Sequence, residues 1–138
     1  MADFYFDEVI KVVKTDSQVV YDKVSRINAK SEENDFFVEL DVHSELYPML
    51  PNEKHRMLIS NSLIISGSGE SKSLADKFEY VMHGLLYKMA DAKSEGDADV
   101  KVEVYISFGG LQLMLRGDPL KMHKFKVDQK LFLLLRKN

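Results

Sequence analysis

The sequence predicts an all-β protein, a small closed antiparallel barrel of about eight strands with at most a short helical turn. Apolar and polar residues alternate in one segment after another, and little of the chain shows helical spacing. The last segment, Lys130–Arg136, is apolar on both faces and would invite aggregation unless other strands covered it. Closing a sheet into a barrel removes its exposed edges, so we expect closure.

Three strands are expected in the N-terminal third of the chain. Phe4–Lys14 is rich in aromatic and β-branched residues. Asp22–Lys30 alternates weakly, with a change of phase before Ile27, and Phe36–His43 alternates cleanly. Polar turns are expected between these strands, at Thr15–Gln18 and at Ser31–Asp35.

Proline and glycine divide the middle of the chain. Pro48 follows Leu46 and Tyr47 and ends the third strand, because proline has no amide to donate to a ladder. His55–Leu63 is expected to be a fourth strand, and the composition of Ser66–Ser71 predicts a flexible surface loop. Ser73–Asp76 suits a single helical turn capped by its serine.

The segment Phe78–Met89 is ambiguous from its pattern. The apolar residues at helical spacing are Leu74, Phe78, Val81 and Met82, with Gly84 as a possible cap. Yet every second residue from Val81 to Met89 forms an alternating series. We favour a strand, followed by a polar, acidic turn from Asp91 to Asp99.

The stretch Val100–Arg116 is the best-defined element and predicts a hairpin. Apolar residues occupy every second position up to Phe108 and again from Leu111. If Gly109 and Gly110 form a two-residue loop, the apolar residues of both arms lie on one side, since glycine supplies the positive φ angles that such loops need. The alternative is one continuous strand bent at a glycine bulge.

The chain ends with a turn, a basic connection and a final strand. Gly117–Pro119 has the composition of a turn, and the connection runs from there to Gln129. In the strand Lys130–Arg136, Leu131, Leu133 and Leu135 form one face and Phe132 and Leu134 the other.

Length and composition indicate one globular domain over residues 1–138. Hydrophobic residues make up 45% of the chain and charged residues 30%. The absence of cysteine excludes disulfides, thiol nucleophiles and thiolate metal sites. No apolar run approaches the ~20 residues of a membrane helix, and the first residues are acidic where a signal peptide would be basic, so we expect no membrane partner.

Charge is spread unevenly along the chain. The net charge is −3, but from Arg116 onward seven basic residues face two acids. That basic quarter could meet phosphate or an acidic protein surface. We favour the simpler interpretation that its charges lie on solvated strand and loop faces.

No catalytic, cofactor or metal site is expected. The four histidines, at positions 43, 55, 83 and 123, show no metal-ligand spacing. Glu39 and Asp41 lie two residues apart on one strand face, but the alternation puts them in solvent and not in a pocket that could separate their pKa values. No phosphate-binding or nucleophile motif is present. The sequence therefore shows no enzyme.

A single-strand nucleic-acid module is the alternative function. A small barrel with exposed aromatic residues could stack bases. The candidates are Tyr5, Tyr80, Tyr87, Tyr105 and Phe108. The net negative charge, and basic residues that do not interleave with these aromatics, argue against it.

Five stretches, in order and spanning nearly the whole chain, resemble the small shared subunit, the eighth in the usual order, of the eukaryotic nuclear RNA polymerases. They are Y-D-K-V-S-R-I around residue 24, L-D-V-H-S-E-L-Y-P at 40–48, S-L-A-D-K-F-E-Y-V-M-H-G-L-L-Y-K at 73–88, V-Y-I-S-F-G-G-L-Q-L-M-L-R-G at 104–117 and the final L-F-L-L-L-R-K. Three departures from the family pattern are the short loop at 66–73, His83 where an aromatic residue is frequent before the glycine, and His55 where phenylalanine is frequent.

The resemblance implies an oligonucleotide/oligosaccharide-binding-like (OB-fold-like) barrel without catalytic residues or cofactors, common to polymerases I, II and III. It implies docking on the largest subunit, contacts with other polymerase subunits, at most weak or indirect contact with nucleic acid, and a nuclear location that includes the nucleolus.

We expect the hairpin tip and the most recognisable strand to bind the polymerase. Phe108 can be an interface anchor, and glycine lets a partner's backbone approach closely. The alternative is that Phe108 only pairs with Leu111 over the barrel mouth. The predicted partner-binding residues are Ser107, Phe108, Gly109, Gly110, Leu111, Tyr80, Met82 and Gly84.

Overall fold

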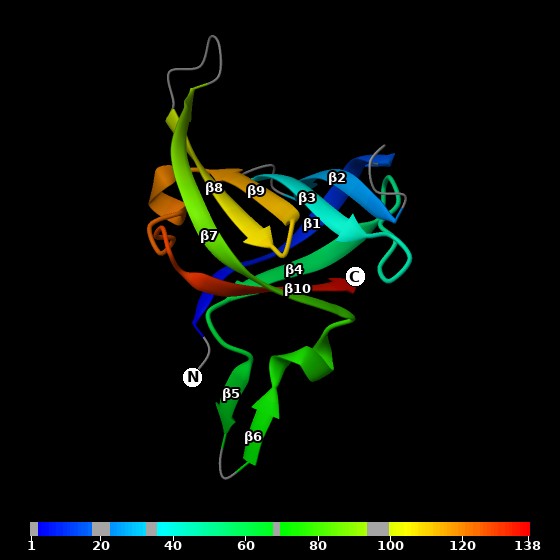
Figure 1. The fold of residues 1–138 in the computed structure, drawn as a ribbon, viewed down its shortest axis with the longest axis vertical. Coiled ribbons are helices and arrows are strands. Elements are labelled where there is room, and N and C mark those ends of the chain that lie inside the picture. Colours follow the sequence, from blue (N-terminus) through cyan, green and yellow to red (C-terminus); the bar gives the residue numbers. More distant parts are fainter. Residues whose placement is uncertain (1–2, 18–22, 33–35, 68–69, 94–99) are drawn as a thin grey trace.

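Eight antiparallel strands close into a barrel in the computed structural model, which describes residues 3–17, 23–32, 36–67, 70–93 and 100–138 (Figure 1). Their order around the barrel is β1-β2-β3-β9-β8-β7-β10-β4, and β4 pairs with β1 to complete the closure. The strands are β1 (Phe4–Ser17), β2 (Val24–Ser31), β3 (Phe37–His43), β4 (Lys54–Ser60), β7 (Tyr80–Lys93), β8 (Val100–Phe108), β9 (Leu111–Gly117) and β10 (Lys130–Lys137). The predicted all-β closed barrel is confirmed.

A small hairpin stands outside the barrel. It consists of β5 (Ile64–Gly67) and β6 (Glu70–Ser73), and the 3₁₀-helix η1 (Leu74–Lys77) follows it directly. The Oγ atom of Ser73 accepts a hydrogen bond from the backbone N–H of Ala75, which confirms the predicted serine-capped turn. A second 3₁₀-helix, η2 (Pro119–Lys121), follows the predicted turn. No helix in the described part of the chain is long and apolar enough to cross a membrane.

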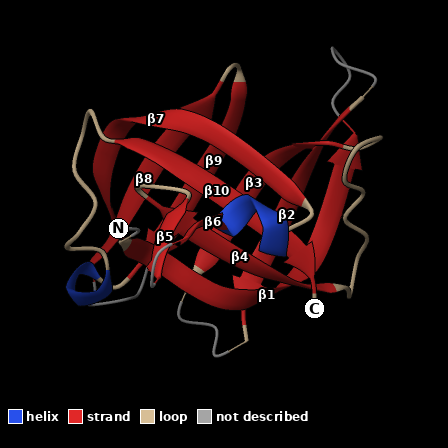
Figure 2. Cartoon of the chain, turned by 90° about the horizontal axis from the view of Figure 1, so that it is seen from below, coloured by secondary structure: helices blue, strands red, loops and turns tan. Residues whose placement is uncertain are grey.

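The last strand is apolar on both faces because both faces are covered. Leu131, Leu133 and Leu135 point into the main core. Leu134 points outward, where it packs with Leu58 of β4 and Leu74 of η1 in a second, smaller cluster. Figure 2 shows η1 in front of the strands that it covers. The covering of β10 therefore explains a pattern that would otherwise be an aggregation hazard.

The predicted glycine hairpin is confirmed, and one continuous strand is excluded. Phe108 lies opposite Leu111, and the pairing continues along β8 and β9 in the predicted register. Gly109 and Gly110 have φ angles of +61° and +100°, a combination typical of a two-residue type I′ loop.

Three predicted segments differ in the structure. The turn predicted from Thr15 is still strand up to Ser17, because the second half of β1 pairs with β2 while its first half pairs with β4. Likewise β7 continues to Lys93 against β8, where a turn was expected from Asp91. The loop predicted at 66–71 contributes to β5 and β6. In each case ladder hydrogen bonds from a partner strand outweigh local polar composition.

Two strands were predicted with the wrong details. In β2 the buried residues are Ser25, Ile27, Ala29 and Ser31, so the side chains keep one phase and the predicted change before Ile27 is wrong. β4 ends at Ser60, three residues early, because the Ser60 side chain bonds the backbone of Ser62 and turns the chain. Parts of the expected strands, loop and turns at 18, 22, 33–35, 68–69 and 94–99 lie outside the described residues.

Candidate partner-binding surface

The structure brings the hairpin tip against the middle of β7. Leu85 of β7 lies opposite Ser107 of β8, and Gly84 precedes Leu85 in β7. A Cβ atom at Gly84 would overlap the carbonyl oxygen of Ser107 and lie 2.6 Å from Cδ1 of Phe108. Glycine at position 84 therefore allows β7 and the end of β8 to approach closely, which places three of the predicted residues together.

The predicted tip exposes its glycines more than its phenylalanine. Phe108 is only 6% exposed and belongs to the main core, as does Met82. Gly109 and Gly110 are exposed, with nothing within 4 Å of their positions for a Cβ atom. A partner would therefore meet the backbone of the tip first.

Tyr80 lies apart from the tip. It is four residues from Gly84 along β7, a distance of ~13 Å in a strand. Its hydroxyl accepts a hydrogen bond from the backbone N–H of His43, at 3.2 Å, and its ring stacks on Tyr47 with centroids 5.3 Å apart. The predicted partner-binding residues thus form one neighbourhood around the tip and a separate one around Tyr80.

An outward apolar strip beside the tip was missed by the sequence prediction. Leu85 is 40% exposed, and Tyr87 is exposed to a similar degree. His83 stacks on Phe132 of β10, with ring centroids 4.2 Å apart. The available signal was the alternation of β7, whose solvent-facing positions carry large side chains in place of small polar ones.

The neighbourhood of Tyr80 contains a polar network that runs from buried to exposed side chains. Tyr47 Oη and His55 Nδ1 are 2.6 Å apart, and His55 Nε2 lies 3.5 Å from Glu53 Oε1. Glu53 in turn pairs with Lys137, at 2.6 Å. A hollow of about 350 Å³ opens beside these groups, lined partly by the exposed Leu50.

The pKa values in this network follow from burial and pairing. Burial lowers the pKa of His55 and raises that of Tyr47, because the charged form of each would lose water. The hydrogen bond from Lys137, with one from the backbone N–H of Leu50, lowers the pKa of Glu53 to about 2. The network therefore holds a neutral histidine next to a carboxylate–ammonium pair.

The side chain of Asp41 lies on the predicted outer face of β3, opposite Arg26 of β2, but it is not exposed to solvent as expected. Asp41 is 5% exposed and accepts hydrogen bonds from Arg26 Nε, at 2.8 Å, and from the backbone N–H of Gln112, at 3.1 Å. Glu39 lies 3.5 Å from the same guanidinium nitrogen. The long side chain of Arg26 covers Asp41 from the neighbouring strand. Both acids are thus tied to one arginine, which suits a structural role for the pair.

The histidines and aromatic residues are dispersed. Of the four histidines, only His55 is buried, and no group of metal-ligating side chains occurs among the described residues. Tyr5 packs on Phe125. Tyr87 of β7 and Tyr105 of β8 lie elsewhere, with their ring centroids 6.3 Å apart. The five candidate base-stacking residues do not share one face.

Comparison with known proteins points to one family. The family model described as RNA polymerase Rpb8 matches residues 7–137. The chain is 39% identical to the DNA-directed RNA polymerases II, IV and V subunit 8B of Arabidopsis thaliana, over 96% of this chain and 94% of the relative. It is 35% identical to the DNA-directed RNA polymerases I, II, and III subunit RPABC3 of Schizosaccharomyces pombe, over 95% and 94%. It is 34% identical to the probable RPABC3 subunit of Caenorhabditis elegans, over 99% and 98%.

Proposed function

This chain belongs to the RNA polymerase Rpb8 family, and we propose that it is a non-catalytic, architectural subunit shared by the nuclear DNA-directed RNA polymerases I, II and III. The observation that carries the proposal is the family match over nearly the whole chain, residues 7–137. In this role the chain acts as one domain, residues 1–138, in the nucleus and the nucleolus. It docks on the largest subunit and supports assembly and transcription.

The pairing of carboxylates with arginines on neighbouring strands supports a structural role for these acids. Asp41 is held by Arg26, and Glu103 accepts from Arg116 at 2.6 Å. Carboxylates that are paired in this way stabilise the relation between neighbouring strands. A general acid or base would instead need a pocket that shifts its pKa toward neutrality.

The hairpin tip supports a docking surface around Gly84. The exposed backbone of Gly109 and Gly110 allows close approach, and Leu85 adds an exposed apolar side chain next to Ser107. We assign to this surface Ser107, Phe108, Gly109, Gly110, Leu111, Met82 and Gly84, with Tyr80 as a second contact point.

Affinity purification of the tagged full chain from nuclear extract tests the proposal. The largest subunits of polymerases I, II and III should co-purify, detected by immunoblotting. Leu85→Glu, which places a charge in the exposed strip, should reduce their recovery. The matched control Leu120→Glu introduces the same charge at an exposed leucine of η2, outside the proposed docking surface. This variant should leave the recovery of the largest subunits unchanged.

Two results would contradict the proposal. One is the absence of every polymerase largest subunit from the purified material. The other is tight, sequence-selective binding of a single-stranded oligonucleotide by the isolated chain, which would favour the alternative nucleic-acid module. An architectural subunit should bind such an oligonucleotide weakly, without selectivity and with steep salt dependence. Recovery of polymerase II without polymerases I and III would narrow the set of enzymes, and the Arabidopsis relative is named for polymerases II, IV and V.

A further inference from the structure

Three lysines stand side by side on neighbouring strands. Lys11 of β1 lies directly opposite Lys30 of β2 on one side and opposite Lys54 of β4 on the other. All three are exposed on the outer surface of the barrel. We call these three residues the lysine row. Neighbouring strands are ~4.8 Å apart, so the row spans ~10 Å across the sheet.

This arrangement is electrostatically unfavourable for the fold. Like charges directly opposite each other in a sheet are destabilising. Lys54 has a counter-charge, since its Nζ lies 2.9 Å from Glu32. Lys11 and Lys30 have no ion pair within the described ranges of the chain. An anion placed between them would remove the repulsion and supply the missing counter-charge.

The row lies beside a hollow of suitable size. Its volume is about 470 Å³, and its lining includes the three lysines and Val13. Val13 occupies the bulge where the pairing of β1 with β2 shifts between Val12 and Lys14, and it is 56% exposed. Bulges commonly redirect a side chain outward. The hollow thus combines two lysines that form no ion pair in the described part of the chain with one exposed apolar side chain.

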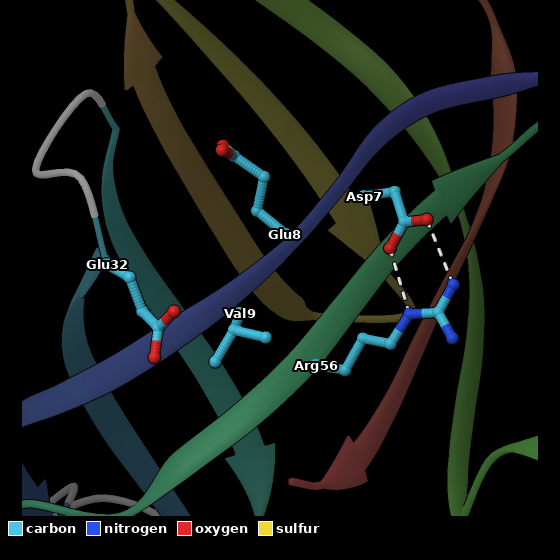
Figure 3. A pocket seen from close by; sticks show the side chains of 5 residues that line it. All are labelled: Asp7, Glu8, Val9, Glu32 and Arg56. Atoms are coloured by element: carbon cyan, nitrogen blue, oxygen red, sulfur yellow. Dashed lines mark hydrogen bonds and ion pairs between the residues drawn. The ribbon is translucent and has the colours of Figure 1, made fainter.

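The adjoining hollow along β1 differs in charge. It is lined by Asp7, Glu8, Val9, Glu32 and Arg56 (Figure 3). Arg56 donates two hydrogen bonds of 2.9 Å to Asp7, and Glu8 leaves β1 on the side opposite to Val9. The positive charge of Arg56 is therefore already matched by Asp7, whereas farther along β1 no ion pair of Lys11 or Lys30 occurs among the described residues.

We propose that the lysine row and Val13 bind an acidic polypeptide segment of a partner, one that presents two carboxylates and an apolar residue on the same face of the extended chain. In an extended peptide, carboxylates two residues apart lie ~7 Å from each other, within reach of lysine side chains on neighbouring strands. An apolar residue two positions beyond the second carboxylate points to the same face and meets Val13. Among the described residues, no aromatic side chain lines the hollow for base stacking. A peptide therefore fits better than a nucleic acid.

The position of the row makes it a second, independent surface. β1 and β8 are opposite each other in the barrel, with three strands between them in either direction. A partner at the β8–β9 tip would leave the lysine row accessible. The inference rests on the charges and register of β1, β2 and β4 and does not depend on the proposed polymerase role.

Fluorescence anisotropy of the full chain tests the proposal. The probe is a fluorescein-labelled octapeptide, Gly-Glu-Val-Glu-Glu-Val-Glu-Gly, at low ionic strength. The double variant Lys11→Gln/Lys30→Gln should bind it ~5-fold or more weakly, as expected for the loss of two exposed ion pairs. The matched control Lys77→Gln/Lys126→Gln removes the same charge from η1 and from the basic connection, and should retain the affinity of the parent chain.

Three outcomes would overturn the proposal. Equal losses of peptide affinity in the two double variants would show that binding depends only on the net charge of the chain. An oligothymidylate octamer that binds more tightly than the peptide and depends on Lys11 and Lys30 would make the row a nucleic-acid site. The third uses the parent chain, so it holds even if the variant folds poorly. Peptide-induced changes in its ¹⁵N–¹H spectrum should centre on Lys11, Val13 and Lys30, and changes confined to other strands would refute the site.

Discussion

The two opposite sides of the barrel are specified in different ways. On the β7–β8–β9 side, Gly84 and Ser107 meet at a distance that no other residue at position 84 would allow. On the β1–β2–β4 side, Lys11 faces like charges on both neighbours and the fold tolerates the repulsion. The first side depends on close steric packing, so substitutions there should lower the free energy of unfolding strongly. On the second side the facing lysines repel each other, so neutral substitutions there should leave the free energy of unfolding nearly unchanged or raise it.

The largest effect is expected for Phe108→Ala on the closely packed side. Because Phe108 is almost fully buried, we expect a loss of about 3 kcal/mol or more in the free energy of unfolding, measured by urea denaturation. As an interface anchor it should also weaken binding to the largest subunit by ~2 kcal/mol. A stability loss without a binding loss would support the alternative that Phe108 only pairs with Leu111.

Gly84→Ala should destabilise the chain by about 2–3 kcal/mol, because the added Cβ atom meets backbone that cannot move away cheaply. The control Gly109→Ala adds the same atom where there is open space but φ is +61°, so it introduces only backbone strain, of about 1 kcal/mol. Equal urea midpoints for the two variants would show that β7 and β8 can separate without penalty.

The double variant Gly109→Val/Gly110→Val should cost roughly 2 kcal/mol, since both positions have positive φ and valine tolerates that region poorly. The urea midpoint measures it. An unchanged midpoint would argue that the loop can adopt another turn without cost.

The sequence predicted the closely packed side better than the charged side. Two glycines between alternating arms define the register of β8 and β9 locally, so Phe108 could be placed opposite Leu111 before the fold was known. The lysine row depends on how β1 pairs with β2 and with β4, strands far apart in the sequence, and on a bulge near Val13. Periodicity within one strand carries no information about such neighbours.

The unexpected burial of Asp41 has the same origin. Its position along β3 was predicted correctly, but its burial depends on Arg26 from β2 and on the backbone of Gln112 from β9. The strand order that brings these three together cannot be derived from alternation. The proposed docking residues could be listed from the family resemblance, but not the separation of Tyr80 from the tip.

A pH dependence should arise on the β4 side, from His55. Burial lowers the pKa of His55 in the folded chain, so as the pH falls the unfolded chain binds a proton at His55 before the folded chain does. The stabilisation is present above the ordinary histidine pKa of ~6.5 and is lost as the pH falls below it, by at most ~1.4 kcal/mol per pH unit for a single group. His55→Phe should flatten this slope in urea titrations from pH 7.5 to 5.5. The same slope in variant and parent would mean that another group titrates.

The smallest expected effect is a gain in stability from Lys11→Gln/Lys30→Gln. Replacing two facing positive charges by neutral side chains of similar length removes a cross-strand repulsion, worth ~0.5 kcal/mol on the scale of such pairs. Because the repulsion is electrostatic and exposed, the gain should appear at low salt and shrink toward zero in 1 M NaCl, where the Debye length is ~3 Å. Urea midpoints at the two salt concentrations measure it. A loss of stability at low salt would mean that the lysine stems pack on β1 and β2 and contribute to the fold, and the two sides of the barrel would then differ less than their charges suggest.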